Sequence, residues 1–109
     1  MSQRHDTLVE QDKRYLWHPF TPQQRWIQSN PLVIERGEGN YLIDDQGQRY
    51  LDAVSSLWTN VHGHNHPYLN QALQRQINQL AHSTLLGLTL PTAIELAKEL
   101  VQRTPKRLS

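Results

Sequence analysis

The chain has 109 residues, of which 37% are hydrophobic and 19% are charged, and its formal net charge is +1 with the histidines neutral. This length suits one modest domain or part of one, and the near-neutral charge argues against nucleic acid or an anionic membrane as a partner. The chain has no cysteine, which excludes disulfides and thiolate metal sites. Because no apolar run approaches the roughly 20 residues that cross a bilayer, and no signal-peptide core follows the start, we expect a cytoplasmic protein.

The first part of the chain, residues 1–31, is expected to form an N-terminal arm. Its first eleven residues are mostly polar and predict a loose lead-in or a single helical turn. Residues 12–21 then combine four large apolar side chains with His18, and Pro19 disfavours helix at the residue before it. Two interpretations remain open for this extended segment. Its aromatic side chains anchor the arm on the body of the protein, or Phe20 forms part of a pocket wall.

Residues 32–53 predict a small antiparallel meander. Three short segments with strand character, 32–36, 41–44 and 49–53, are separated by glycine-containing turns. We expect those glycines to supply the positive φ angles that tight connections need. They are Gly37, Gly39 and Gly47.

After the meander and a polar segment, the hydrophobic period changes to 3.6 residues. This predicts an amphipathic helix over 67–80, a connector over 81–90, and a second amphipathic helix from Pro91 that stops before Pro105. Two such helices and a narrow meander offer apolar stripes, but no central sheet to receive them. We therefore expect an α/β protein represented by an α+β fragment, in which residues 32–109 begin a larger domain whose central sheet is missing.

The polar segment over 55–67 carries the densest chemistry of the chain. His62, His64 and His66 alternate, and in a strand their rings would share one face as metal ligands. However, the intervening glycine and the following proline disfavour a regular strand, and no carboxylate lies nearby in the sequence. We therefore predict no metal site, and favour a turn in which the imidazoles cap backbone groups and the start of the next helix.

Other chemistries fit the same segment poorly. Ser55 and Ser56 lack the Gly-x-Ser-x-Gly context of a nucleophile elbow. Gly37 and Gly39 lack the strand-to-helix context of a dinucleotide-binding loop, and no Gly-Lys-Ser/Thr follows any glycine. Trp58 is either a core anchor or a ring that stacks on a flat ligand, and the residues alone leave both interpretations open.

Four motifs together resemble the N-terminal part of the 7,8-diaminopelargonic acid aminotransferases, which are class III, fold-type I, pyridoxal-phosphate enzymes of biotin synthesis. The meander is shared by class III aminotransferases in general, whereas the aromatic arm combined with Ser-Ser-x-Trp and His-Gly-His is more selective. The motifs are Asp12-Lys13-x-x-Leu16-Trp17-His18-Pro19-Phe20-Thr21, Gly37-x-Gly39-x-Tyr41-Leu42-x-Asp44, Leu51-Asp52-Ala53-x-Ser55-Ser56-Leu57-Trp58-x-Asn60-x-His62-Gly63-His64 and Ala81-His82-Ser83-Thr84-Leu85-Leu86-Gly87.

The resemblance implies an enzyme that converts 8-amino-7-oxononanoate to 7,8-diaminononanoate with pyridoxal 5'-phosphate, as a homodimer whose active sites lie at the subunit interface. It also implies that Phe20, Leu57 and Trp58 line the substrate pocket. The family often has tyrosine at the first of these positions and tryptophan at the second. Here Phe20 lacks the hydroxyl group and Leu57 lacks the indole. A sulfonium ligand benefits from stacked aromatic faces, so we hypothesise that lysine competes with S-adenosylmethionine as the amino donor.

No catalytic residue is expected within this chain. In the family, the Schiff-base lysine and the groups that hold the cofactor phosphate and pyridine ring lie downstream. Lys13, Lys98 and Lys106 are placed on an arm, a solvated helix face and a terminus, and none is expected in a desolvated pocket that activates an amine. The chain alone is therefore expected to be inactive. The alternatives are another class III ω-aminotransferase, acting on ornithine, γ-aminobutyrate or β-alanine, and a non-catalytic truncated fragment that binds a partner subunit.

Overall fold

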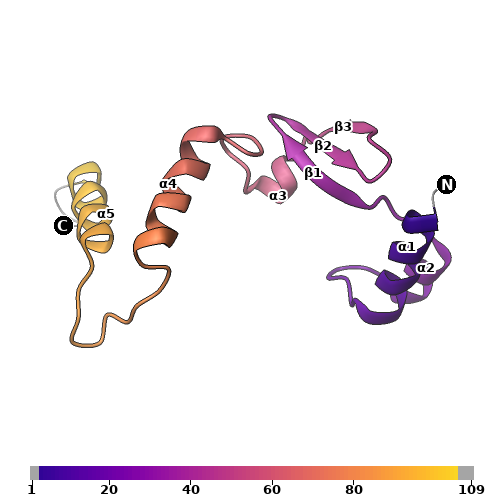
Figure 1. Ribbon diagram of the computed structural model, residues 1–109, viewed down its shortest axis with the longest axis horizontal. Coiled ribbons are helices and arrows are strands. Elements are labelled where there is room, and N and C mark those ends of the chain that lie inside the picture. Colours follow the sequence, from indigo (N-terminus) through magenta and orange to yellow (C-terminus); the bar gives the residue numbers. More distant parts are fainter. Residues whose placement is uncertain (1–2, 106–109) are drawn as a thin grey trace. The chain divides into compact units, whose positions relative to one another are not determined.

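The computed structural model describes residues 3–105. The chain divides into two compact units, Met1–Gln71 and Ala72–Ser109. The first unit holds α1, α2, the three strands, α3 and the start of α4, and the second holds the rest of α4 and α5 (Figure 1). The predicted boundary after residue 31 concerns the domain of the whole protein, and it stays a prediction.

Helix α1, Gln3–Tyr15, is longer than the sequence indicates. The expectation of a loose lead-in or a single helical turn is wrong. His5 and Val9, which lie one turn apart, form the buried face of the helix. Contacts with the meander also hold the helix, because Arg4 pairs with Glu35 at 2.6 Å and His5 Nδ1 lies 3.0 Å from Asp45 Oδ1. These contacts connect residues far apart in sequence, so the local pattern does not reveal them.

A short helix, α2 (Gln23–Gln28), follows the extended segment after α1. The sequence pattern did not predict it. Its first turn begins after Pro22, whose fixed φ favours a helix start. The segment between the two helices carries Phe20 at a positive φ of 51°. In the first unit, α1 and α2 lie together near one end of the strands (Figure 1).

The predicted meander is confirmed. Strands β1 (Ile34–Glu38), β2 (Tyr41–Asp44) and β3 (Arg49–Leu51) form an antiparallel sheet in the order β1-β2-β3. Among the described residues, Val9 and Ile43 are the buried apolar side chains, so the core is small. It includes one side chain from α1 and one from the central strand.

Asp44 at the end of β2 is a buried carboxylate whose hydrogen bonds are satisfied. It accepts hydrogen bonds from the backbone N–H groups of Gln46 (3.0 Å) and Gln48 (2.8 Å) and from the Tyr50 hydroxyl (3.0 Å). Burial raises the pKa of Asp44, but these hydrogen bonds, with the nearby His5, outweigh burial and hold the pKa below its ordinary value. The β2–β3 turn is thereby fixed from inside.

Helices α4 (Pro67–Gln79) and α5 (Pro91–Arg103) confirm the two predicted helices to within two residues at each end. In the part of the chain that the structure describes, neither helix has a buried residue. The apolar side chains of α5 are therefore exposed within the second unit, and Gly87 in the connector has the positive φ of a turn (72°). Among residues 3–105, no helix combines the length and the apolar character needed to cross a membrane.

Candidate functional site

The four residues of α3, Ser55–Trp58, form a left-handed turn. Their φ angles are 51°, 46°, 63° and 68°, and none of the four is glycine. Left-handed helical backbone costs an L-residue roughly 1–2 kcal/mol, because Cβ crowds the carbonyl oxygen that follows. Such a run persists only where surrounding contacts hold it, and strain of this kind is concentrated at functional sites. The turn therefore needs an anchor.

Asp52 is that anchor. Its Oδ1 accepts the backbone N–H of Ser56 at 2.9 Å, and its Oδ2 accepts the Ser56 hydroxyl at 2.7 Å. The same Oδ2 lies 2.9 Å from Nε2 of His64, which carries the proton because an ionised carboxylate only accepts. The two Ser56 hydrogen bonds, with that of His64, lower the pKa of Asp52 despite burial, and its side chain is only 5% exposed.

His64 is fixed in turn by the meander. It exchanges two backbone hydrogen bonds with Gly39, of 2.7 and 3.1 Å. Its ring lies against Gly37, where an added Cβ would come within 2.6 Å of the His64 Cγ. The expectation of a positive φ holds for Gly39 and Gly47, but it is wrong for Gly37. Glycine is needed at position 37 for the close approach of His64.

The turn exposes two of the three side chains for which the resemblance implies substrate contact, Leu57 and Trp58. Trp58 is 82% exposed and Leu57 is 65% exposed, so Trp58 is not a core anchor of the described chain. Trp58 lies beside an open hollow of about 450 Å³. The other residues that line the hollow are Ala53, Val54, Ser55, Asn60 and Val61. A flat ligand has access to the indole from this side.

The arrangement of Ser56, Asp52 and His64 does not form a nucleophilic triad. In such a triad the histidine lies between serine and acid, where it removes the hydroxyl proton. Here the carboxylate lies in the middle and binds both neighbours. These contacts restrain the backbone of the turn.

The three alternating histidines do not converge. His64 turns to Asp52, while the rings of His62 and His66 meet edge to face with centroids 6.3 Å apart. Within residues 3–105 there is no group of three or more side chains placed to hold a metal ion. The expectation that the imidazoles cap backbone groups is wrong for His64, because its ring binds the side-chain carboxylate of Asp52.

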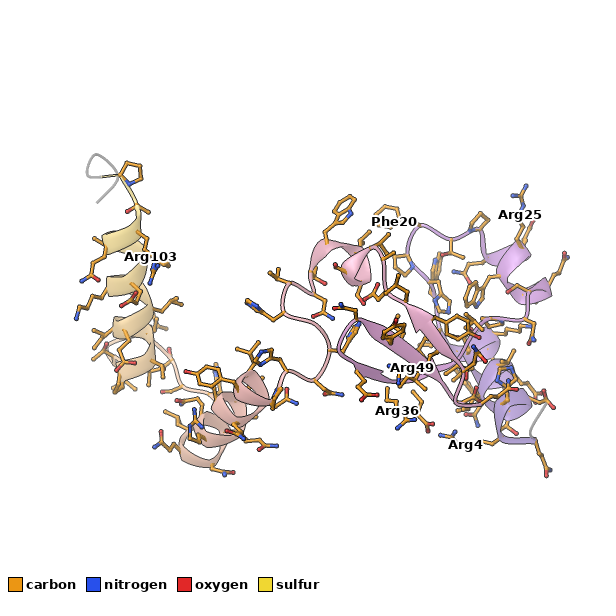
Figure 2. The ribbon with its side chains drawn as sticks, turned by 90° about the horizontal axis from the view of Figure 1, so that it is seen from above. Arg4, Phe20, Arg25, Arg36, Arg49 and Arg103 are labelled. Carbon is orange, nitrogen blue, oxygen red and sulfur yellow. The ribbon has the colours of Figure 1, made fainter. Side chains whose placement is uncertain are left out.

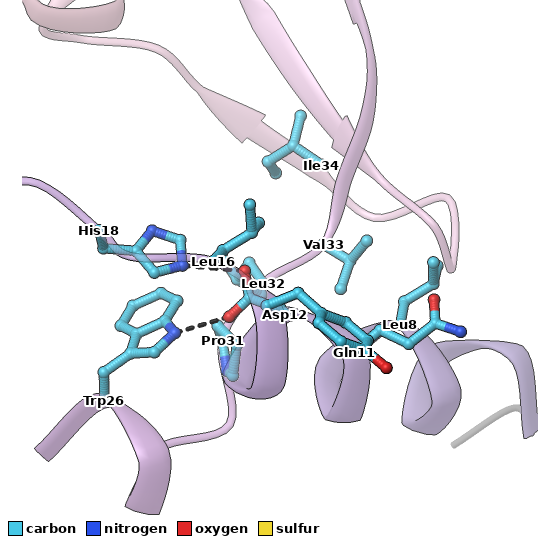
Figure 3. A pocket seen from close by; sticks show the side chains of 11 residues that line it. Leu8, Gln11, Asp12, Leu16, His18, Trp26, Pro31, Leu32, Val33 and Ile34 are labelled. Atoms are coloured by element: carbon cyan, nitrogen blue, oxygen red, sulfur yellow. Dashed lines mark hydrogen bonds and ion pairs between the residues drawn. The ribbon is translucent and has the colours of Figure 1, made fainter. Parts of the chain in front are cut away.

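A second aspartate holds the arm. Asp12 on α1 accepts a hydrogen bond from Nε2 of His18 at 2.8 Å and another from the Trp26 indole at 2.6 Å (Figure 3). The two aromatic rings pack with centroids 4.2 Å apart. Phe20 lies on the loop between them and is fully exposed (Figure 2). The expectation that the aromatic side chains of residues 12–21 anchor the arm on the body of the protein is wrong, because Tyr15, Trp17 and Phe20 are exposed. Trp26 instead ties parts of the arm to each other, and the role of Phe20 in a pocket wall stays a prediction.

Next to Asp12, an apolar pocket of about 470 Å³ lies between α1, α2 and the start of β1 (Figure 3). Leu8, Leu16 and Leu32 contribute to its walls. Most of the residues that line the pocket belong to the arm. Neither Phe20 nor Trp58 lines it.

The model of the class-III aminotransferase family matches residues 23–109. The chain belongs to this family. The match begins at α2 and includes the meander, the left-handed turn and both amphipathic helices, so the site described above lies largely inside it. The family resemblance carried by the sequence motifs is thereby confirmed.

The chain is similar to adenosylmethionine-8-amino-7-oxononanoate aminotransferases. It is 51% identical to the one from Geobacter sulfurreducens over 94% of this chain and 22% of the relative. The crystal structure of the one from Methanocaldococcus jannaschii superposes with a TM-score of 0.90, at 50% identity, over 93% of this chain and 23% of that chain. An omega transaminase from Pseudomonas jessenii, solved in complex with PMP, gives a TM-score of 0.84 at 36% identity over 90% and 22%. The chain thus spans less than a quarter of the length of these relatives.

Family and neighbours imply pyridoxal 5'-phosphate as the cofactor in general, but neither described lysine lies in a pocket that could hold it. The cofactor needs an amine in a desolvated pocket. Lys13 is half-buried on α1 and lines none of the hollows described, Lys98 is exposed on α5, and Lys106 lies outside the described residues.

The family resemblance pointed to Phe20, Leu57 and Trp58, but the sequence did not predict which residues hold the segments that carry them. Asp12, Asp52 and His64 appear in the motifs, but apart from Ser56, four residues from Asp52, their side-chain partners lie 6 to 14 residues away, beyond any helix or strand period. A usable signal existed at Gly37, because a glycine in a strand marks close backbone approach.

Proposed function

We propose that this chain forms the substrate-facing wall of an aminotransferase that converts 8-amino-7-oxononanoate to 7,8-diaminononanoate in biotin synthesis. The observation that carries the proposal is the left-handed turn that exposes Leu57 and Trp58 from an otherwise hydrogen-bonded segment. The names of relatives at about 50% identity support the choice of acceptor. Phe20, Leu57 and Trp58 are proposed to contact the substrate.

In this proposal the pyridoxal phosphate is bound mainly by residues absent from the chain, in a cytoplasmic homodimer. The exposure of Lys98 and the small share of each relative that the chain covers support this division. The cofactor, when bound, would act as the electron sink for amino transfer. The residues of this chain would bind and orient the acceptor beside it.

The amino donor is proposed from two observations that point in different directions. The names of the relatives carry adenosylmethionine. At the turn, however, one indole stands beside an aliphatic side chain, and one aromatic face fewer weakens contact with a sulfonium by about 1 kcal/mol. We infer that S-adenosylmethionine is used and that lysine competes with it.

A chimera tests the proposal. In the Methanocaldococcus jannaschii relative, the segment that matches this chain is replaced by residues 1–109, and the product is loaded with pyridoxal phosphate. We expect amino transfer to 8-amino-7-oxononanoate with S-adenosylmethionine, and measurable transfer with lysine. Activity with the first donor and none with lysine would overturn the donor inference. No transfer to 8-amino-7-oxononanoate from any donor, in a chimera that is folded and binds the cofactor, would overturn the acceptor.

The likeness to the omega transaminase favours one alternative, a class III enzyme with another acceptor. Assays of the same chimera with aldehydes that correspond to ornithine, γ-aminobutyrate and β-alanine separate the two. For the fragment alternative, residues 1–109 are expressed alone and followed by circular dichroism. Cooperative melting would support an autonomous binding module, whereas a broad transition agrees with the small core.

A further inference from the structure

The position of Trp58 depends on its backbone. The side chain is largely exposed, so few neighbours within the described chain restrain it. The backbone beneath it is restrained by the Trp58 N–H, which bonds the Val54 carbonyl at 2.9 Å, and by the Thr59 hydroxyl, which bonds the Ser56 carbonyl at 3.0 Å. Whatever fixes the left-handed turn therefore fixes the indole.

The carboxylate of Asp52 is the group on which the restraints of the turn converge. It binds Ser56 inside the turn twice and His64 outside it once. Its own backbone N–H bonds the Asn40 carbonyl at 2.9 Å, which joins it to the β1–β2 connection. If the carboxylate is removed, the Ser56 N–H, the Ser56 hydroxyl and the His64 ring all lose their partner, and the turn can relax toward ordinary backbone.

The meander contributes through His64 and Gly37. The His64 ring reaches Asp52 only because Gly37 leaves room for it, as shown by the 2.6 Å approach of a built Cβ. Asn65, itself at a φ of 55°, reinforces the contact by donating from Nδ2 to the Gly37 carbonyl at 2.6 Å. A path of direct contacts therefore runs from β1 through His64 and Asp52 to the turn.

We propose that Asp52 is a positioning residue for the acceptor site: through Ser56 and His64 it fixes the left-handed turn and thereby the place where Trp58 meets the substrate. The inference rests on the proposed function, in which Trp58 contacts the acceptor. Asp52 itself touches no reacting atom in this proposal. Its substitution should therefore affect acceptor use, while cofactor content and dimer formation stay unchanged.

The test uses the chimera with four substitutions. For Asp52→Ala we expect kcat/KM for 8-amino-7-oxononanoate to fall about a hundredfold, as for a reacting partner misplaced by about 1 Å. Asp52→Asn keeps one acceptor oxygen and should give an intermediate loss. Gly37→Ala touches neither the turn nor Asp52, yet it displaces His64, so we expect a loss of about tenfold. Glu38→Gln, an exposed carboxylate of the same sheet, is the matched control and should leave kcat/KM unchanged.

A second readout does not depend on activity. The chimera is labelled with 5-fluorotryptophan, and the ¹⁹F resonance of Trp58 is assigned by its loss in Trp58→Phe. We expect this resonance to shift or broaden in Asp52→Ala and Gly37→Ala, and to stay in place in Glu38→Gln, while the Trp26 resonance stays fixed in all variants. Absorbance of bound pyridoxal phosphate reports whether each variant still folds and binds the cofactor.

The two readouts separate failure of the inference from failure of the proposed function. An unchanged Trp58 resonance in both Asp52→Ala and Gly37→Ala would overturn the positioning role, whatever the activity. A moved resonance with unchanged acceptor kinetics would also overturn it, because Trp58 would then not set acceptor use. If the parent chimera transfers no amino group to this acceptor, the proposed function fails, and the resonance alone decides whether Asp52 positions the indole.

Discussion

The arm and the left-handed turn are held by similar groups but differ in what those groups stabilise. Asp12 joins a histidine and an indole, and Asp52 joins a histidine and a serine. The Asp12 side chain is 19% exposed and ties α1 to the loop and α2 by side-chain donors, whereas Asp52 is 5% exposed and also accepts a backbone N–H. The first carboxylate tethers a segment of ordinary helix and loop, and the second holds a run of strained backbone.

The effect of losing such a carboxylate therefore depends on the conformation of the backbone that it holds. Loss of a tether leaves α1 and α2 intact, because their own hydrogen bonds are unaffected. Loss of an anchor under four left-handed residues releases the strain that the contacts had balanced.

The largest contrast is expected between Asp52→Ala and Asp12→Ala in the chimera. The first should lower kcat/KM for the acceptor about a hundredfold, and the second by about tenfold or less, because it loosens the arm without changing the turn. Steady-state kinetics with varied 8-amino-7-oxononanoate measure both. Equal losses would show that the two anchors are equivalent, and the distinction would be withdrawn.

The second prediction concerns the hydrogen bond between Trp26 and Asp12 in the arm. Trp26→Phe removes the indole N–H that bonds Asp12 at 2.6 Å but keeps a ring beside His18. A hydrogen bond to a charged group contributes about 1.5 kcal/mol at the low end, which is roughly tenfold in the local opening equilibrium. Amide hydrogen exchange over 16–22 in the chimera should therefore accelerate about tenfold. Trp17→Phe, at an exposed indole within the same segment, is the matched control and should leave the exchange of the other amides of the segment unchanged.

A pH dependence tests the Asp52 side. Because its folded-state pKa is lowered, the stabilising contribution of the carboxylate is present above the ordinary value of 3.8 and is lost as pH falls through the folded pKa. We expect the melting temperatures of the parent chimera and Asp52→Asn to differ at about pH 6, and the difference to shrink as the pH falls below 3.8. Thermal melts over a series of pH values measure this. A difference that grows on acidification would contradict the assigned direction.

The regular elements could be predicted because their signals are local. Pro67 and Pro91 mark helix starts, the 3.6-residue period runs through both helices, and Gly39 and Gly47 mark the strand connections. Helix α1 was missed because its buried face carries a histidine paired with Asp45, which a hydrophobic pattern does not register.

The anchors of the site could not be predicted for a different reason. Ser56 and Leu57 have positive φ, and neither serine nor leucine is among the non-glycine residue types enriched there. Asp52 and His64 are twelve positions apart, and only the folded meander brings them together. The exposed residues Phe20, Leu57 and Trp58 were named from the family resemblance, and their contact with substrate stays a prediction.

The smallest effect on stability is expected at Glu99, an exposed carboxylate of α5. Arg103 and Glu99 pair at 3.0 Å one turn apart, with side chains 78% and 55% exposed. Such pairs contribute about 0.3–0.5 kcal/mol, because water screens the charges and two flexible side chains must be ordered. Glu99→Gln should therefore lower the stability of the chimera by no more than this amount, and added salt should remove the difference. Glu95→Gln on the same helix is the control. If Glu99→Gln lowered the stability of the chimera as much as Asp52→Ala does, burial and strained backbone would not determine how much each carboxylate contributes to stability.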